Sequence, residues 1–489
     1  MKKIFIIFLF LGILLNGCDF GDFGDINIDP NNPSSTDTRF LYVYAVRQAI
    51  PTFYMTGTYD PWTVIYPQYI SERSNIQFTT FLLTTFGTNN YYSQSLKNLN
   101  KIIEFNTDAD TKNENWVTLF NASNDNQIAL ARTLKAYIYM HLTDALGMLP
   151  YSEALKATEG LYKPKYDDQQ SIYTDLNKEL EEAFAQFNVN IPFDDSYEIL
   201  YNGDVSKWKK FNASVRMQLA IKLFKADENT GKTRFAKAFN DGFIRSNADI
   251  FSYKYLSEST NENPLYNNIE VSRRRDFSPS GVFVDSLISY NDPRLTVYAD
   301  KNKFGTYYGM PFGLVRANAL LVDPDTISAF HPNYYKQNSP AVLVTPSIML
   351  LAAAEAAERG WISASSENLY NEAIVAAFNQ HGLGDEIDEY MNQEKVKFNT
   401  GGTSAERIVQ IAMQKWLASF LQDSFEAWAD WRRLGVPYLK PGPSATIAEI
   451  PRRRYYDSGD YNANKDNRDA AVAVQGADNF FTRVWWDKP

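Results

Sequence analysis

The chain has 489 residues, of which 58 are acidic and 48 are basic, and its formal net charge is −10. This negative balance gives no electrostatic footprint for nucleic acid, which proteins bind through basic surfaces. With three histidines and one cysteine, the chain lacks the ligands of a Cys/His zinc site and the partners of an internal disulfide.

The N-terminus has the pattern of a secretory signal that ends at the only cysteine. Two lysines at residues 2–3 precede an apolar run at residues 4–15, which is too short to cross about 30 Å of hydrocarbon as a helix. Gly17 stands directly before Cys18, in an arrangement that resembles a bacterial lipobox, where the signal is cut before the cysteine and the thiol takes a diacylglycerol. We therefore predict a lipoprotein signal peptide at residues 1–17 and lipidation of Cys18. The alternative is a secreted protein with one free thiol.

Residues 18–35 are predicted to form a lipid-anchored flexible tether, because they are rich in Asp, Asn, Pro and Gly. The acidic residues after Cys18 resemble the surface-export signal of Bacteroidetes lipoproteins; a solvated acidic linker is the alternative, and the two are compatible. Removal of residues 1–17, which hold two lysines and no acid, moves the formal net charge to −12. No later apolar run reaches eighteen residues and no clear linker divides the remainder. We predict no transmembrane span and a single domain at residues 36–489.

Helical periodicity dominates the remaining chain. Apolar residues recur every three or four positions at 128–145 and 172–187. Further helices are predicted at 345–360 and 365–382, where small residues at the crossing indicate a tetratricopeptide-like pair. One more is predicted from about residue 404 to residue 431. The predicted fold class is therefore mainly α.

Three segments between these helices have a different composition. Residues 50–95, 250–340 and 436–489 are rich in aromatic, Asn and Pro residues and show little helical period. We predict long loops with a few short strands. Loops of this length are uncommon in a compact protein unless they are functional, so the helices are expected to be scaffold and the aromatic loops the working surface.

The sequence shows no motif for metal binding or nucleophilic catalysis. His141, His331 and His381 have no ligand-like spacing and are predicted to be structural. Residues 108–113 lack the glycine and the terminal glutamate of a calcium loop. There is no nucleophile elbow, P-loop or dinucleotide-binding glycine pattern. No pair among the 58 acidic residues stands out as the two carboxylates of a glycosidase, so that chemistry stays open.

Short runs of arginine at residues 273–275, 432–433 and 452–454 are conspicuous in an acidic chain. We expect them to form salt bridges that pin loops. Contact with a protein partner is the alternative, because arginine is enriched at interfaces.

Several segments together resemble one family, the SusD/RagB-like outer-membrane lipoproteins of Bacteroidetes. The most specific are residues 143–154, with the pattern T-D-x-x-G-x-x-P-Y-S-E-A, and residues 354–361, with A-E-A-x-x-R-G-W. One departure is Ala145-Leu146, where an aromatic residue before the glycine is commoner in the family. The other matching segments are residues 29–33, 131–137, 164–173, 208–216, 415–416 and 426–435.

The resemblance implies about four tetratricopeptide-like helix pairs with loops packed on them, no enzymatic activity and no cofactor or metal. It also implies a nutrient-binding lipoprotein on the outer membrane, facing the cell exterior. Such a protein captures a glycan, or for some members a peptide, and delivers it to a SusC-like TonB-dependent barrel transporter. The runner-up function is a lipid-anchored carbohydrate-active hydrolase with an acid/base carboxylate pair, and a third is an adaptor without a small ligand.

The resemblance further implies that ligand contacts come from aromatic and polar side chains in variable loops. Some of these rings are expected to lie in the core instead, because aromatic side chains dominate cores as well as interfaces. The candidates are Trp62, Tyr66, Tyr69, Asn89, Tyr91 and Tyr92 in the first loop region, and Tyr307, Tyr308, Asn333 and Tyr334 in the second.

Overall fold

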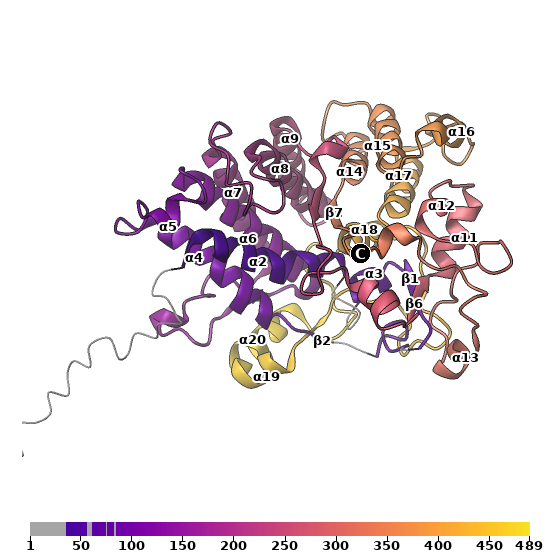
Figure 1. Ribbon diagram of the computed structural model, residues 1–489, viewed down its shortest axis with the longest axis horizontal. Coiled ribbons are helices and arrows are strands. Elements are labelled where there is room, and N and C mark those ends of the chain that lie inside the picture. The colour runs from indigo at the N-terminus through magenta and orange to yellow at the C-terminus, as the bar shows by residue number, and fades with distance from the viewer. Residues whose placement is uncertain (1–35, 56–60, 75, 83–84) are drawn as a thin grey trace, which may run out of the picture.

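The computed structural model describes residues 36–489 apart from residues 56–60, 75, 83 and 84. Cys18 and the tether at residues 18–35 lie outside the described residues, so both stay predictions. Helices make up most of the regular structure and the strands are short (Figure 1). The mainly α fold class is therefore confirmed. None of the helices described is both long and apolar enough to cross a membrane.

The first group of helices packs side by side in chain order. Helix α6 lies against α4 and α7, and α8 lies against α7 and α9 (Figure 1). The bounds in this group are α2 Thr38–Tyr54, α4 Lys97–Thr107, α5 Asn115–Thr118, α6 Asn124–Leu146, α7 Gln169–Gln186, α8 Val205–Ile221 and α9 Glu228–Asp241. The short helix α3 (Trp62–Ile65) contacts α2 but lies outside this row (Figure 1).

A second group of helices follows the middle loops. Helix α14 packs against α15 and α17, and it also contacts α8 and thereby joins the two groups. The bounds are α14 Pro346–Glu358, α15 Ser366–Gln380, α16 Ile387–Met391, α17 Ser404–Ala418 and α18 Ser424–Leu434.

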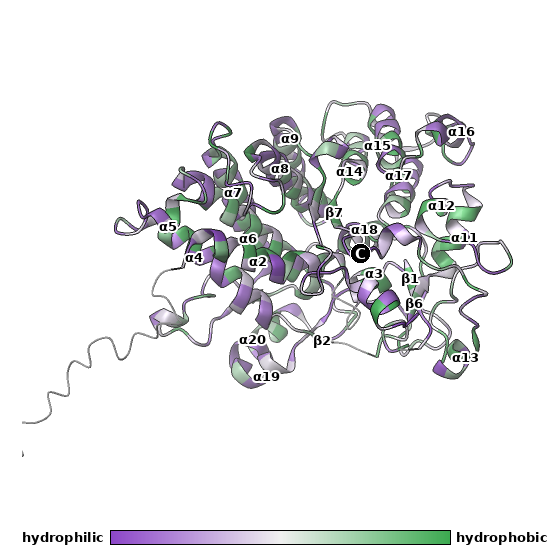
Figure 2. Ribbon diagram, viewed as in Figure 1, coloured by the Kyte–Doolittle hydropathy of each residue, from purple (hydrophilic) through white to green (hydrophobic). Residues whose placement is uncertain are grey.

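Helix caps explain why these segments begin and end where they do. The hydroxyl of Thr345 accepts from the amide of Ile348 at the start of α14, and Pro346 occupies the first helical position. Gly147 ends α6 with a φ of 79°, which is in the left-handed region. Around their circumference the helices carry both hydrophobic and hydrophilic residues (Figure 2), as packing into a layered core requires.

The predicted helix at 404–431 is wrong in one respect, because the structure contains two helices there. Helix α17 ends at Ala418, and Leu421 and Asp423 then take φ values of 49° and 44° before α18 begins. The buried carboxylate of Asp423 accepts a hydrogen bond from the amide group of Gln218 at 3.0 Å. A contact with a residue 205 positions away in the chain therefore helps to fix this break.

The three loop regions are joined to one another by short strands. β1 (Ile70–Glu72) pairs antiparallel with β6 (Phe277–Pro279), and β2 (Thr85–Phe86) pairs parallel with β8 (Tyr455–Tyr456). The other strand pairs are β3 (Leu149–Pro150) with β4 (Tyr166–Asp167) and β5 (Phe251–Tyr253) with β7 (Ala341–Val344).

The prediction of short strands in the loop regions is confirmed, but the loops also contain short helices that it missed. These are a π-helix at Tyr91–Leu96, α10 Pro264–Tyr266, α11 Gly281–Ser289, α12 Leu295–Tyr298, α13 Arg316–Leu321, α19 Ser458–Ala463 and α20 Lys465–Gln475.

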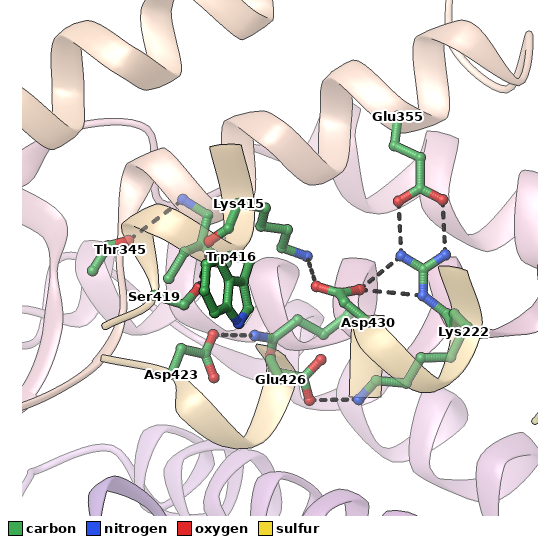
Figure 3. A network of polar contacts seen from close by, with 12 residues as sticks. Lys222, Thr345, Glu355, Lys415, Trp416, Ser419, Asp423, Glu426 and Asp430 are labelled. Atoms are coloured by element: carbon green, nitrogen blue, oxygen red, sulfur yellow. Dashed lines mark hydrogen bonds and ion pairs between the residues drawn. The ribbon is translucent and has the colours of Figure 1, made fainter. Parts of the chain in front are cut away.

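A network of buried charges joins α14, α17 and α18 (Figure 3). Arg433 donates to both carboxylate oxygens of Glu355 at 2.7 Å, and Asp430 pairs with Lys415 at 2.6 Å and with Arg433 at 2.7 Å. Burial alone would raise the pKa of Asp430, but Lys415 and Arg433 lower it to about 2. Lys222 extends the network, because it pairs with Glu426 at 2.5 Å. Arg433 therefore forms salt bridges, as predicted, whereas Arg432 donates to the backbone carbonyls of Asp144 and Arg452.

Candidate functional site

The first and second aromatic loop regions meet at the β1–β6 pair. Next to β6, Ser280 forms an isolated β-bridge with Met310. The amide of Met310 also donates to the carbonyl of Pro279 at 2.9 Å. This close approach requires Gly309, because a Cβ there would lie 2.4 Å from the carbonyl oxygen of Ser280. Backbone pairing therefore gives the two regions a fixed relative position.

A second pairing folds residues 298–308 against residues 325–331. The amide of Ser328 donates to the carbonyl of Tyr308 at 2.7 Å, and the amide of Lys303 donates to the carbonyl of Asp325 at 2.9 Å. The outer part of this pair carries three aromatic side chains that are exposed or half-buried, namely Phe304, Tyr307 and Tyr308.

We use the term loop surface for the exposed and half-buried side chains of residues 270–275, 300–308 and 325–335. These segments lie close together, since Arg275 pairs with Asp325 at 2.9 Å and Tyr335 lies near Asp300 and Glu270. Burial and the neighbouring Asp300 carboxylate raise the pKa of both Tyr307 and Tyr335. Their hydroxyls therefore stay protonated at neutral pH and can donate hydrogen bonds.

The arginines of the loop surface are paired but accessible. Arg273 lies 3.0 Å from Glu270, and Arg274 lies 2.7 Å from Asp276. Their side chains remain 78% and 55% exposed. An exposed ion pair leaves donors and acceptors free on its outer side, so it can also hydrogen-bond a ligand.

The loop surface thus combines flat apolar ring faces with charged and amide groups. Phe304 is 69% exposed and Tyr308 is 52% exposed. Asn302 accepts from the amides of Phe304 and Thr306, which holds the turn that presents the phenylalanine. Such a surface can stack on the C–H faces of a sugar ring while its polar groups hydrogen-bond the hydroxyls.

Four of the predicted ligand residues lie in the core, as expected for some of these rings. Trp62, Tyr66, Tyr69 and Tyr91 are nearly inaccessible to solvent, with 6% exposure at most. The ring of Trp62 packs edge-on against Trp428 with a centroid distance of 5.4 Å. A buried ring has no face to offer a ligand, and these four side chains fix the first loop region to the helices.

The other predicted residues divide between the loop surface and a separate cleft. Tyr307, Tyr308 and Asn333 belong to the loop surface. Tyr334 is half-buried as well, but its ring packs edge-on against Phe420 and its hydroxyl oxygen is buried.

Asn89 and Tyr92 do not join the loop surface. They line a cleft of about 510 Å³ between the π-helix at Tyr91–Leu96, residues 146–166 and α19. The hydroxyl of Tyr92 donates to the carbonyl of Pro150 at 2.6 Å. Asn89 and Tyr92, the candidates of the first loop region that are not buried, therefore lie apart from the candidates of the second loop region.

Phe304 and Tyr335 are exposed or half-buried rings of the loop surface that sequence reasoning missed. The exposure of Phe304 could have been predicted from the sequence, because the turn-forming residues Asn302 and Gly305 lie on either side of it. A large apolar residue at the tip of a turn is expected to be exposed. Tyr335 directly follows the predicted Tyr334, and only the fold shows which of the two rings faces outward.

The three histidines have structural environments, as predicted. Burial lowers the pKa of His141 to about 3, and its ring stacks on Phe53 at 4.2 Å. Burial also lowers the pKa of His381 to about 4, and His331 accepts from the amide of Asn333 at the start of a short helix. In the part of the chain that the structure describes, no group of three or more His, Cys, Asp or Glu side chains could hold a metal ion.

Glu72 is a buried carboxylic acid where β1 leads into the first loop region. Burial raises its pKa to about 8, and one oxygen accepts from the amides of Phe78 and Thr79 at 3.1 and 2.8 Å. A raised carboxyl pKa is a property of catalytic acids. Glu72 is only 1% exposed, however, and its contacts hold a turn.

The molecule is thus a scaffold of packed helices that carries long loops with exposed aromatic rings. The chain belongs to the SusD-like family described as "Starch-binding associating with outer membrane", whose model matches residues 30–457. Members of this family are nutrient-binding proteins of the outer membrane.

Solved structures of similar proteins agree with this fold. A chitin-binding protein is 27% identical with a TM-score of 0.75, over 93% of this chain and 100% of its own. An outer-membrane protein of Bacteroides vulgatus associated with nutrient binding is 25% identical with a TM-score of 0.77, over the same shares. A chitin-binding SusD homologue of Flavobacterium johnsoniae is 23% identical with a TM-score of 0.74, over 92% of this chain and 98% of its own. Among curated proteins, none matches the chain.

Proposed function

We propose that this protein captures a glycan on its loop surface without catalysis and delivers it to a SusC-like TonB-dependent transporter. The observation that carries this proposal is the set of exposed and half-buried rings at residues 304, 307 and 308. The accessible ion pairs Lys303–Asp323 and Arg275–Asp325 lie on or beside the same paired segments. The backbone pairing described above holds these rings on a fixed frame. Rings held in place before the ligand arrives lose little conformational entropy on binding.

A glycan fits this surface better than a peptide does. Peptides are usually bound by an open strand edge, a hydrophobic groove or an arginine cluster that reads acidic groups. The arginines here are each paired with a carboxylate, which neutralises their charge. Such a surface favours a ligand with neutral hydroxyl groups over one with acidic groups. Two relatives are described as chitin-binding, which supports the same ligand class for this chain.

The proposed anchor is a lipid on Cys18, which places the protein on the outer membrane facing the exterior. The family description supports the outer membrane. A tether at residues 18–35 would leave the domain free to move over the transporter while the lipid keeps it at the membrane. Mass spectrometry of the mature N-terminus tests this: we expect an acylated cysteine, and an unmodified thiol would contradict the anchor.

We also propose that residues 36–489 fold as one domain. The parallel pairing of β2 with β8 supports this, because it joins residues near position 85 to residues near position 455. One cooperative unfolding transition, seen by both fluorescence and circular dichroism, is expected. Two separate transitions would contradict a single domain.

The alternative function is a carbohydrate-active hydrolase with two carboxylates. Glu72 has a suitably raised pKa, but its burial keeps it away from a sugar ring on the loop surface. The proposal is therefore a binding protein without turnover. Incubation of the mature chain with starch and chitin oligosaccharides, followed by product analysis, is expected to show intact substrate.

The binding proposal is tested by calorimetry on the soluble chain from Asp19 onward. The ligands are maltoheptaose, chitohexaose and a set of unrelated peptides. We expect one of the glycans to bind and the double variant Tyr307→Ala/Tyr308→Ala to lose at least tenfold in affinity. The control is Tyr44→Ala, an exposed tyrosine on α2. Binding to peptides alone, or full binding by the double variant, would refute the assignment.

A further inference from the structure

A second groove lies at the start of α17, between the segment at residues 394–401 and the segment at residues 435–438. Its volume is about 800 Å³, within the size range of small-molecule sites. Two tyrosines line it: Tyr438 is 79% exposed, and Tyr290 is half-buried at the end of α11. None of the residues predicted from sequence to bind ligand lies in this groove.

The segment at residues 394–401 is held rigidly against α17. The amide group of Gln410 donates to the carbonyl of Lys397 at 2.8 Å, while its oxygen accepts from the amide of Asn399 at 3.0 Å. The hydroxyl of Tyr370 donates to the carbonyl of Val396 at 2.7 Å, and Val396 is buried. The groove therefore exists before any ligand arrives, which lowers the entropic cost of binding.

Several polar side chains of the groove have no partner among the residues that the structure describes. Glu394, Lys397 and Thr400 are exposed, and none of their side chains makes a hydrogen bond or ion pair with another of the described residues. They supply an acceptor, a donor and a hydroxyl that can serve as either. These are the groups that sugar hydroxyls require.

The aromatic rings add the apolar component. Lys440 lies 5.0 Å from the ring centroid of Tyr438, and Lys395 lies 5.7 Å from that of Tyr290. A cation on one face of a ring helps to orient it and leaves the other face for a ligand. The groove thus has the same combination of rings and hydrogen-bonding groups as the loop surface, but on different elements.

We propose that this groove is a second glycan-binding site, formed around Tyr438 and Tyr290 with Glu394, Lys397 and Thr400 as hydrogen-bonding groups. This inference rests on the proposed function, because it assigns the same ligand class to both sites. Helix α11 begins two residues after β6 and ends next to Tyr290. Its nine residues span about 14 Å, and the groove shares no lining residue with the loop surface. The two sites are therefore separate, and a glycan polymer has a second place to bind.

The test uses the soluble mature chain and retention in gels that contain soluble starch or glycol chitin. Tyr438→Ala should weaken retention at least threefold on whichever glycan the wild-type chain binds, because one of two linked sites is lost. The triple variant Phe304→Ala/Tyr307→Ala/Tyr308→Ala should keep a weaker retention that disappears when Tyr438→Ala is added. The matched control is again Tyr44→Ala on α2, which should behave as wild type.

Oxidative footprinting gives a readout that does not require a substitution in the groove itself. Tyr438 and Tyr290 should be protected from hydroxyl radicals when the bound glycan is present, in wild type and in the triple variant alike. If wild type binds glycan but Tyr438→Ala retains it fully and Tyr438 is unprotected, the second site is refuted and the loop surface stands. If wild type binds no glycan at all, the proposed function itself fails.

Discussion

Two regions of this molecule contain short runs of arginine close to carboxylates and use them in opposite ways. In α18, Arg432 lies 3.5 Å from the ring centroid of Trp428, and the neighbouring Arg433 is fully enclosed by its carboxylate partners. On the loop surface, Arg273 and Arg274 pair with carboxylates but keep more than half of their side chains in solvent. The same short run of arginine in the sequence therefore serves as a structural junction in one place and as an accessible surface in the other.

The difference teaches that the surroundings decide what an ion pair contributes. A charge inside the protein has lost its hydration, so removal of its partner leaves an uncompensated charge and costs several kcal/mol. A pair at the surface is hydrated and screened, and it contributes about 1 kcal/mol or less. Substitutions in the two regions should therefore differ strongly in their effect on the free energy of unfolding.

The largest effect is expected for Arg433→Ala. Glu355 would lose both of its hydrogen bonds from Arg433, and the free energy of unfolding should fall by about 3–5 kcal/mol. Urea denaturation measures this. The matched control is Arg275→Ala on the loop surface, which should cost less than about 1 kcal/mol. Equal losses for the two variants would contradict the contrast between the regions.

The aromatic counterpart of that comparison is Trp62 against Tyr308. Trp62→Ala should cost about 3–5 kcal/mol, because the ring is 1% exposed and packs against Phe425 and Trp428. Tyr308→Ala should leave the unfolding midpoint unchanged and reduce glycan affinity. Denaturation and calorimetry on both variants separate the roles. If Trp62→Ala unfolded normally and lost only binding, the original prediction of Trp62 as a ligand residue would be restored.

Much of the helical scaffold could be predicted from the sequence because its signals are local. The cap at Thr345 and the stop at Gly147 depend on residues within one helical turn, and both are confirmed. The break between α17 and α18 has no such signal. It falls at Leu421 and Asp423, which are not turn glycines, and Asp423 bonds to Gln218 from a distant helix.

The candidate site was harder to predict, because exposure of an aromatic ring is a tertiary property. Tyr66 and Tyr308 come from segments of similar composition, yet Tyr66 accepts a hydrogen bond from the guanidinium of Arg454 at 2.7 Å in the core. Tyr308 points outward because residues 298–308 pair with residues 325–331. Of the predicted loop regions, only residues 250–340 supply the loop surface, and the packing of the chain decides which of their rings are exposed.

A pH-dependent effect is expected at Glu72, a buried carboxylic acid on β1. Its pKa is about 8 in the folded protein and near 4.3 in an unfolded chain. Between these values the folded state keeps a proton that the unfolded state has lost, so stability should fall as pH rises from about 4.5 to 8, by at most about 1.4 kcal/mol per pH unit. Above that window the dependence ends.

The variant Glu72→Gln removes the titrating group but keeps the turn, since the side-chain amide oxygen can still accept from the amides of Phe78 and Thr79. It therefore isolates the contribution of Glu72 to the pH dependence of stability. Unfolding midpoints measured from pH 5 to pH 9 should fall less steeply for the variant than for wild type. Parallel curves would show that Glu72 titrates near its ordinary value. In that case the carboxylate would be hydrated, and the first loop region would be more open than the structure indicates.

The smallest change in stability is expected for Arg274→Ala. Its partner Asp276 keeps other hydrogen bonds, from the side chain of Asn268 at 3.2 Å and from Ser74, so no buried acceptor is left unpaired. The free energy of unfolding should change by less than about 0.5 kcal/mol.

Glycan affinity should nevertheless fall severalfold in Arg274→Ala, because the exposed guanidinium belongs to the loop surface and can donate to a sugar hydroxyl. Arg274→Lys keeps the charge but loses the planar fork of donors, so it should recover only part of the affinity. A loss of stability without a loss of affinity would place Arg274 with the buried arginines of α18 and remove it from the loop surface.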